Sequence, residues 1–406
     1  MSEMGRSRLP IAIVVAVAAA AAATFLLRPR SGLIDPAPVE AQQYFTASQL
    51  DRAEDFRGLQ RVLGLAGLGV GIATLAVLVR RPPRGLARRL EARPLLGGAA
   101  AGAGISLLLI VTELPIRAWM RARSLDVGLA TQSWPDWALD VLKAAGIGAV
   151  TAAVAGLVAV ALIRRFPRGW WAPAAALVVA YGALTIWLYP VVIDPLFNRF
   201  EPLREGPLRH EVLKLADRAG VDVGEVYRVD ASRRTSAVNA YVNGLGHSKR
   251  VVLYDNLIDD FPPDEVRTVV AHELGHQKHD DLLRGLAWLA LVAPAGTFLT
   301  QALAERLAGR GWSRGPAALP AVALAITLVG LGLGTASNAL SRQVEARADA
   351  FALELTRDPS GFIDFQHRIA VRNVSDPDPP RLVHLLFDTH PTTVERIGFG
   401  VAWPPG

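Results

Sequence analysis

Seven long apolar segments dominate the chain, and arginine, proline or glycine residues bound each of them. An α-helix needs about 20 mostly apolar residues to cross the roughly 30 Å hydrocarbon core of a bilayer, and each segment is near that length. The segments lie at residues 10–27, 60–79, 96–114, 137–163, 170–193, 283–303 and 317–337. The pattern therefore predicts a mainly α-helical, polytopic membrane protein with about seven transmembrane helices. The first segment follows Arg6 and Arg8 and would also suit a secretory signal peptide, although we favour a retained anchor.

The longest polar stretch, residues 194–281, separates the fifth apolar segment from the sixth. Its first part, residues 203–220, has apolar positions at helical spacing. Three segments bounded by turn residues are then typical of strands, at 225–232, 236–246 and 249–257. We predict one helix and a small antiparallel sheet, followed by a helix that starts near Pro263, with Asp259 or Asp260 as its cap.

Composition supports a membrane protein and excludes several other classes. Hydrophobic residues make up 51% of the chain, and the net charge is +6. The arginines lie in short loops beside the apolar segments, as at residues 80–93, so membrane flanks explain the charge and no nucleic-acid partner is expected. The chain has no cysteine. Disulfides and thiolate metal sites are therefore excluded, and any metal must be held by histidine and carboxylate groups.

Two histidines lie four residues apart in the segment VVAHELGHQKHDD, residues 269–281. On a helix, His272 and His276 share one face and can present two imidazole nitrogens to one ion. Glu273 is placed to take a proton from water that the metal activates, as in the H-E-x-x-H arrangement of metalloproteases. So short a pattern also arises by chance, and two ordinary polar helix residues are the alternative.

A catalytic zinc site needs a third protein ligand, and the segment 338–355 offers one. Glu345 and Asp349 lie four apart on one predicted helix face. One carboxylate can then bind the metal while the other accepts the second ring N–H of a ligating histidine. A solvated helix surface with Arg342 and Arg347 is the alternative for these residues alone. Ionisable residues directly beside apolar spans favour the metal site, because such residues are costly unless they face a polar cavity or each other.

Further segments resemble the type I CAAX prenyl protease family, which comprises integral-membrane zinc endopeptidases related to the bacterial heat-shock membrane protease. Besides residues 272–276, the resemblance rests on residues 193–209, 236–257, 338–349 and 389–397, in family order around seven spans. It implies that the spans enclose a chamber and that a zincin-like catalytic domain carries the small sheet.

The resemblance implies a role for each candidate residue. His272, His276 and Glu345 would hold one zinc ion, Glu273 would be the general base, and Asp349 would support a ligand histidine. Residues 239–242 would form an edge strand that pairs with extended substrate through Asn239, Ala240 and Tyr241; an ordinary sheet strand is the alternative. His390 and Arg396 would stabilise the oxyanion, for which helix capping by residues 389–393 is the alternative. We expect the remaining histidines to be structural or at the surface: His210, His247, His279, His367 and His384.

Four regions follow from this interpretation. Residues 1–193 form an N-terminal membrane region with five spans, and 194–281 a catalytic segment with the sheet and the H-E-x-x-H helix. Residues 282–337 form two further spans, and 338–406 a C-terminal catalytic segment with the third ligand.

The predicted function is zinc-dependent hydrolysis of peptide bonds in membrane-associated or extended peptides, which in this family can be lipidated. One alternative is a quality-control protease of the heat-shock type. Another, from a different class, is a non-catalytic scaffold or lipid-binding chamber with a structural zinc. We expect a bacterial cytoplasmic membrane protein in contact with lipid. The arginine distribution places residues 194–281 outside the cytoplasm, whereas the eukaryotic relatives are expected to face the cytosol.

Overall fold

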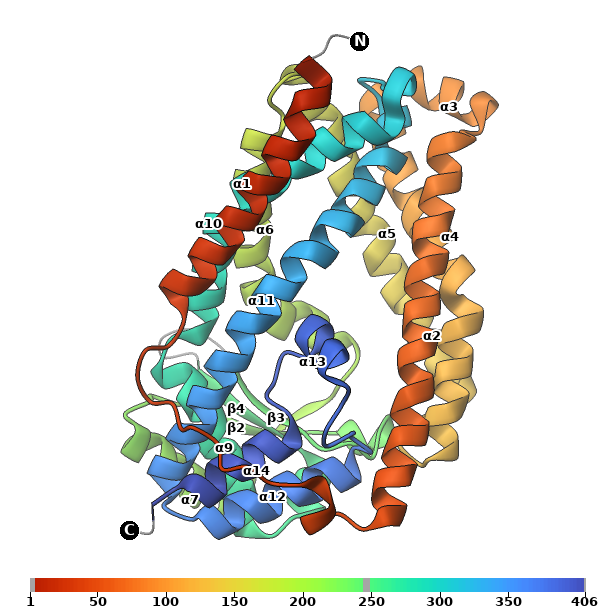
Figure 1. The fold of residues 1–406 in the computed structure, drawn as a ribbon. Coiled ribbons are helices and arrows are strands. Elements are labelled where there is room, and N and C mark those ends of the chain that lie inside the picture. Colours follow the sequence, from red (N-terminus) through yellow and green to blue (C-terminus); the bar gives the residue numbers. More distant parts are fainter. Residues whose placement is uncertain (1–3, 244–248, 405–406) are drawn as a thin grey trace.

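The computed structural model describes residues 4–243 and 249–404. Within these ranges, seven helices are long and apolar enough to cross a membrane. They are α1 (Met4–Leu27), α2 (Ala47–Arg80), α4 (Pro94–Asp126), α5 (Trp134–Arg165), α6 (Trp171–Leu188), α10 (Asp281–Ala308) and α11 (Leu319–Thr356). Each contains most or all of one predicted apolar segment, so the prediction of seven spans is confirmed (Figure 1).

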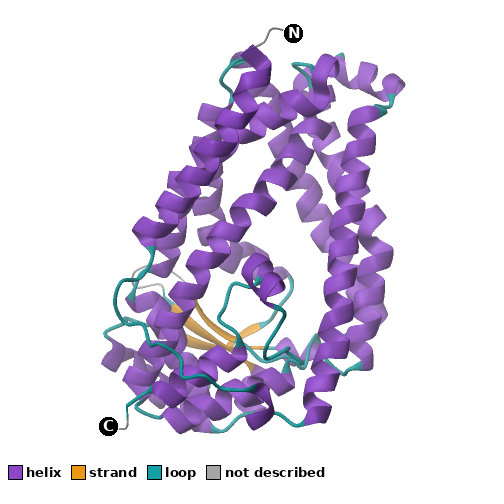
Figure 2. Ribbon diagram, viewed as in Figure 1, coloured by secondary structure: helices purple, strands orange, loops and turns teal. Residues whose placement is uncertain are grey.

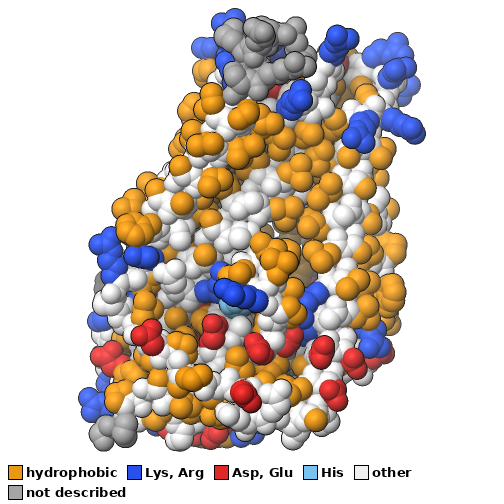
Figure 3. Space-filling model, viewed as in Figure 1, with side chains coloured by type: hydrophobic (Ala, Val, Ile, Leu, Met, Phe, Trp, Pro, Cys, Tyr) orange, Lys and Arg blue, Asp and Glu red, His pale blue; other side chains and the backbone are white. Residues whose placement is uncertain are grey.

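Large apolar side chains cover the outside of these helices. Val14 of α1 and Leu142 of α5 are each 68% exposed, and Val150 is 67% exposed. Figure 3 shows hydrophobic side chains over the middle of the molecule and charged side chains toward its two ends. Contiguous apolar surface of this extent marks a membrane or protein contact, and helices of this length and composition can cross a bilayer.

Exposed arginines gather at one end of the spans, near α3 (Arg84–Glu91). Acidic side chains are visible mainly at the other end, below the spans in Figure 3. We call the first end the arginine-rich end. Its exposed arginines include Arg8, Arg80, Arg81, Arg84, Arg88, Arg89, Arg93, Arg164, Arg165, Arg168, Arg306, Arg310 and Arg314.

Small residues bring α4 and α5 into close contact. A Cβ atom at Gly98 would lie 2.7 Å from the Gly156 carbonyl oxygen, and one at Gly102 would lie 2.0 Å from that of Ala152. Such stretches of small residues are the usual means by which membrane helices approach at backbone distance. The spans are arranged around an open middle in the ribbon view (Figure 2). The enclosed chamber implied by the family resemblance stays a prediction.

The remaining helices and the sheet gather at the end opposite the arginine-rich end (Figure 1). The helices are α7 (Pro207–Ala219), α8 (Asp255–Asp260), α9 (Pro263–Lys278), α12 (Pro359–Arg372), α13 (Arg381–Phe387) and α14 (Thr393–Ala402). Helix α9 begins after Pro262, which makes no side-chain cap, with Pro263 in its first turn. The predicted cap is wrong because Asp259 and Asp260 end α8 instead.

The sheet is mixed, which corrects the predicted antiparallel sheet. Its order is β1 (Phe200–Pro202), β2 (Glu225–Val229), β4 (Arg250–Tyr254) and β3 (Ala240–Asn243). Strands β1 and β3 run antiparallel to their neighbours, but β2 and β4 are parallel. The chain leaves β2, crosses to the edge as β3 and returns as β4 between them, so β4 has the direction of β2. Residues 244–246 of the predicted strand segment 236–246 lie outside the described residues.

One apolar core joins the sheet to α9 and α11. Val226, Val251 and Leu253 of the sheet, Leu274 of α9 and Leu353 of α11 are each 0% exposed and belong to one cluster. Their burial is the main force that holds α9 between the sheet and the end of α11. The face of α9 that carries the two histidines is thereby turned toward α11.

Candidate active site

Three candidate metal ligands meet where α9 contacts α11. His272 Nε2 lies 3.2 Å from His276 Nε2 and 3.1 Å from Glu345 Oε2. His276 Nε2 lies 3.5 Å from Glu345 Oε1. In the described part of the chain, these three residues form the group whose ligand atoms can converge on one ion.

The spacing of these atoms fits a zinc ion. Ligand atoms about 2.0–2.1 Å from a tetrahedral zinc are themselves roughly 3.3–3.4 Å apart, and the three separations of 3.1–3.5 Å bracket that value. Two imidazoles and a carboxylate are also the donor set of one class of catalytic zinc site.

Gly275 permits the approach of α11. A Cβ atom at Gly275 would lie 3.1 Å from Phe351 Cδ1 and 3.3 Å from Ala348 Cα. Ala348 and Phe351 lie about one and two turns from Glu345 along α11. The small residue in H-E-L-G-H therefore sets how near the third ligand comes to the two histidines.

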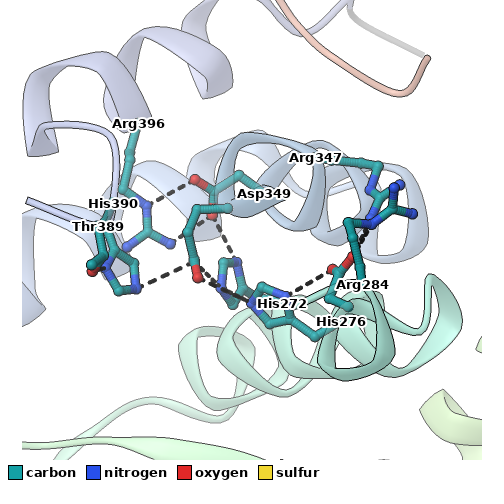
Figure 4. Close-up of polar contacts among 10 residues, drawn as sticks. His272, His276, Arg284, Arg347, Asp349, Thr389, His390 and Arg396 are labelled. Atoms are coloured by element: carbon teal, nitrogen blue, oxygen red, sulfur yellow. Dashed lines mark hydrogen bonds and ion pairs between the residues drawn. The ribbon is translucent and has the colours of Figure 1, made fainter. Parts of the chain in front are cut away.

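Asp349 supports His272 from the far side of the ring. His272 Nδ1 lies 2.8 Å from Asp349 Oδ1, and the carboxylate is 0% exposed. Arg396 donates two hydrogen bonds to the same carboxylate, at 2.8 and 2.6 Å (Figure 4). The pairing fixes the ring so that Nε2 faces the other ligands.

Asp281 supports His276 in the same way, and sequence reasoning missed this role. His276 Nδ1 lies 3.1 Å from Asp281 Oδ2, and Asp281 Oδ1 accepts a 3.2 Å hydrogen bond from Arg284. Arg347 of α11 also donates to Asp281. Figure 4 shows Arg284 and Arg347 on the opposite side of the site from Arg396. Each ligand histidine therefore has its own carboxylate and arginine.

The carboxylates favour protonated histidines in the metal-free protein. Although burial opposes the charge, hydrogen bonds with Asp281 and Glu345 raise the pKa of His276 to about 10. Against burial, Asp349 likewise raises the pKa of His272. Burial raises the pKa of Glu273. Metal binding must therefore displace protons from this site.

Glu273 lines a cavity of about 410 Å³ together with His272 and His390. Residues of α9, of α12 and of the segment 235–239 also line this cavity. The Glu273 carboxylate accepts a hydrogen bond from the Val242 N–H of β3. The candidate base is thus held between the metal ligands and the edge strand.

Strand β3 is the edge of the sheet, but its outward-facing positions differ from the predicted ones. Asn239 O accepts from Tyr254 N of β4, so the backbone groups of Asn239 and Tyr241 face the sheet. Because backbone groups alternate along a strand, the N–H and C=O groups of Val238, Ala240 and Val242 face away from the sheet. Of the three residues predicted to pair with substrate (Asn239, Ala240 and Tyr241), only Ala240 therefore has backbone groups free to face a substrate strand. The Tyr241 hydroxyl instead donates a 2.7 Å hydrogen bond to Asp194.

Side chains already bind the outward groups on both sides of Ala240. Asn373 accepts from Val238 N at 3.0 Å and donates to Val238 O at 3.3 Å. At the other side, Gln277 donates to Val242 O at 2.9 Å. The edge strand is therefore held at both ends, with Ala240 between them.

His390 and Arg396 both lie at the site, in different positions. His390 Nε2 is 3.3 Å from Glu345 Oε2, and its side chain is 54% exposed. The Arg396 side chain is 16% exposed and is bound to Asp349. The cap of α14 is made by Thr392 and Glu395, which form a capping box, so capping does not account for His390.

The other histidines lie outside the ligand group. His279 packs against Phe351, His367 against Phe45, and His384 pairs with Asp388. His210 is exposed. His247 lies outside the described residues.

Comparison with known proteins agrees with this geometry. The sequence model of peptidase family M48 matches residues 202–399. A second sequence model, which describes the five membrane helices of the CAAX prenyl protease N-terminal region, matches residues 62–199. The metalloprotease YhfN of Bacillus subtilis is 34% identical over 304 residues, which cover 72% of this chain and 70% of that protein. The chain belongs to peptidase family M48.

Other M48 relatives are named CAAX prenyl proteases. The Arabidopsis thaliana homologue is 33% identical over 220 residues, and the alignment covers 52% of this chain and 51% of the plant protein. The chain thus aligns with about half the length of that relative. The crystal structure of S. mikatae Ste24p has the same fold, with a TM-score of 0.79 over 97% of this chain and 99% of that one, at 19% identity. This M48 protein is an integral-membrane metallopeptidase.

Proposed function

We propose that this M48 peptidase is a zinc endopeptidase in which His272, His276 and Glu345 hold one ion and Glu273 is the general base. The observation that carries the proposal is the convergence of the three ligand atoms beside Glu273, which lines a cavity. A structural zinc site would need no such base at an open position.

When bound, zinc would polarise the scissile carbonyl and lower the pKa of water at the site. Glu273 then takes the proton of the attacking water and delivers it to the departing amine nitrogen. His390 donates a hydrogen bond to the oxygen on which negative charge develops. Arg396 acts through Asp349, because both of its hydrogen bonds to that carboxylate hold His272 in place.

The substrate binds as an extended strand beside β3. Main-chain pairing gives affinity without demanding a particular sequence. Because side chains bind Val238 and Val242, we place the pairing at Ala240. This position lies between Val242, which contacts Glu273, and the wall of the cavity. The backbone of the substrate would therefore enter near the base.

Peptide segments near a bacterial cytoplasmic membrane are the proposed substrates. Relatives that are named CAAX prenyl proteases support a membrane-associated C-terminal peptide as one such substrate. Backbone pairing at β3 accounts for peptide binding with or without a lipid group.

Metal analysis and peptide cleavage test the proposal together. The purified protein should contain one zinc per chain, and Glu273→Gln should retain that zinc while cleavage falls by at least about a hundredfold, the lower range for loss of a general base. The matched control is Glu354→Gln, an exposed residue of the same type on α11, which should cleave at the wild-type rate. Equal cleavage by Glu273→Gln and wild type would show that Glu273 is not the base. Bound zinc without any cleavage by the wild-type protein would instead favour the non-catalytic scaffold with a structural zinc.

A further inference from the structure

The segment that carries His390 borders two cavities. Residues 388–391, which we call the His390 segment, connect α13 toward α14. One cavity, of about 650 Å³, is lined by this segment and by residues of α2, and another, of about 880 Å³, by Pro391 and residues 33–36. Pro391 lines both cavities. Thr389 and His390 are exposed. Packing alone therefore does not fix the position of His390.

Two side chains of α11 bind the backbone just before His390. Asn338 donates to Leu386 O at 2.9 Å. Arg342 donates to Asp388 O at 2.6 Å and to His384 O at 3.2 Å. The carbonyl groups in the last turn of a helix lack partners within the helix, and a cation beside them is stabilising. Asn338 and Arg342 therefore tie the end of α13, and the start of the His390 segment, to α11.

The same face of α11 carries the third metal ligand. Residues 338, 342, 345 and 349 are four, three and four positions apart, which places them on one face of a helix. Glu345 Oε2 lies 3.3 Å from His390 Nε2. Arg342 is half-buried, so it does not belong to a solvated helix surface. One face of α11 thus holds both Glu345 and the backbone that presents His390 to it.

We propose that Arg342, together with Asn338, is a positioning residue for His390. This role rests on the proposed function, in which His390 donates a hydrogen bond to the oxygen on which negative charge develops. Arg342 fixes Asp388 O, two residues before His390. Within the segment, the Thr389 hydroxyl lies 2.9 Å from His390 Nδ1 and orients the ring (Figure 4). Fixing the backbone at Asp388 therefore fixes the direction of His390 Nε2.

Loss of the Arg342 guanidinium should slow the chemical step and leave substrate binding unchanged. Displacement of a catalytic group by about 1 Å can cost 100-fold in rate, and we expect kcat to fall by about tenfold in Arg342→Met. KM should stay at the wild-type value, because the hydrogen bond from His390 strengthens only in the transition state. Arg342→Lys should recover most of the lost kcat, because an ammonium group can still donate to Asp388 O.

The matched control is Arg381→Met. Arg381 is exposed in the first turn of α13, where a cation is not stabilising, so its loss should leave kcat unchanged. All variants should keep one zinc per chain. If Arg342→Met does not fold, Asn338→Leu removes the second hydrogen bond to α13 and should show the same pattern with a smaller fall in kcat. A wild-type kcat in both Arg342→Met and Asn338→Leu would overturn the inference.

A double-mutant cycle shows whether Arg342 acts through His390. Removal of one donor to an oxyanion costs about 100-fold or more in kcat, which is the fall expected for His390→Ala. Because residues that act as one unit are not additive, adding Arg342→Met to His390→Ala should lower kcat further by less than about twofold. A tenfold fall on both backgrounds would show that Arg342 acts independently of His390, and would overturn the inference.

Hydrogen exchange separates this inference from the proposed function. The backbone amides of residues 388–390 should exchange faster in Arg342→Met than in wild type, whereas Arg381→Met should leave them unchanged. Unchanged exchange in Arg342→Met would overturn the inference even if cleavage falls. Faster exchange together with wild-type cleavage by His390→Ala would show that Arg342 holds the segment but that His390 has no part in catalysis, which contradicts the proposed function alone.

Discussion

Asp281→Asn should weaken zinc binding although Asp281 touches no metal ligand atom. The carboxylate holds His276 Nδ1 at 3.1 Å and is 7% exposed. Loss of a residue that orients a metal ligand typically lowers metal affinity by about 10- to 100-fold. In the variant, Arg284 and Arg347 also lose their shared acidic partner. We therefore expect a decrease of about 30-fold.

The neighbouring residue provides a matched control for this change. Asp280 is exposed and has a positive φ of 52°, which asparagine adopts readily. Asp280→Asn therefore makes the same chemical change one residue earlier and should leave zinc affinity unchanged.

Competition with a chromophoric chelator measures the zinc affinity of both variants, and thermal unfolding gives a second reading. At free zinc about 1,000 times the wild-type Kd, zinc stabilises the folded protein by about 4.1 kcal/mol. After a 30-fold loss of affinity, the same concentration gives about 2.1 kcal/mol. If Asp281→Asn and Asp280→Asn bind zinc equally, Asp281 does not support His276 and the reasoning from the ring geometry is wrong.

Three further predictions concern the helix contact, the protons and the orientation of the site. Gly275→Ala should lower the free energy of unfolding by about 1–3 kcal/mol, because α11 must shift to make room for the added Cβ atom. Gly285→Ala is the control and should not lower the free energy of unfolding, because a Cβ atom at Gly285 meets no atom within 4 Å. Because the pKa of His276 is raised to about 10 without metal, zinc affinity should increase from pH 6 to pH 10. Calorimetry near pH 7 in two buffers should show proton release on zinc binding, and release of none would contradict this. The positive-inside rule places the arginine-rich end in the cytoplasm. In the cysteine-free chain, Ser360→Cys should therefore react with an impermeant maleimide in intact cells and Gly85→Cys should not; the reverse pattern would refute this orientation.

The parts of the site that the sequence could reveal are those with a fixed helical spacing. His272 and His276 are one turn apart on any helix, and Glu345 and Asp349 repeat that spacing on another. The structure brings these four side chains together, but spacing alone could not show how α11 meets α9. That contact depends on Gly275 and on a core whose members come from distant parts of the chain.

Other features depend on pairings that no local pattern contains. The outward face of β3 follows from its register with β4, and the parallel pairing of β4 with β2 was missed for the same reason. The role of Asp281 was missed because an acidic residue at a helix end usually contacts solvent.

The two histidines are supported from opposite sides, and α11 takes part in both supports. Asp349 and Arg347 lie two residues apart on α11, the first bound to His272 and the second to the carboxylate that holds His276. Glu345 is on the same stretch of helix. The contact between α11 and α9 therefore positions the third ligand, Glu345, and also orients both histidine rings. The pKa values of both histidines are raised, so their ring nitrogens hold protons at the positions that zinc requires. Metal binding must displace those protons, which explains why the affinity should depend on pH.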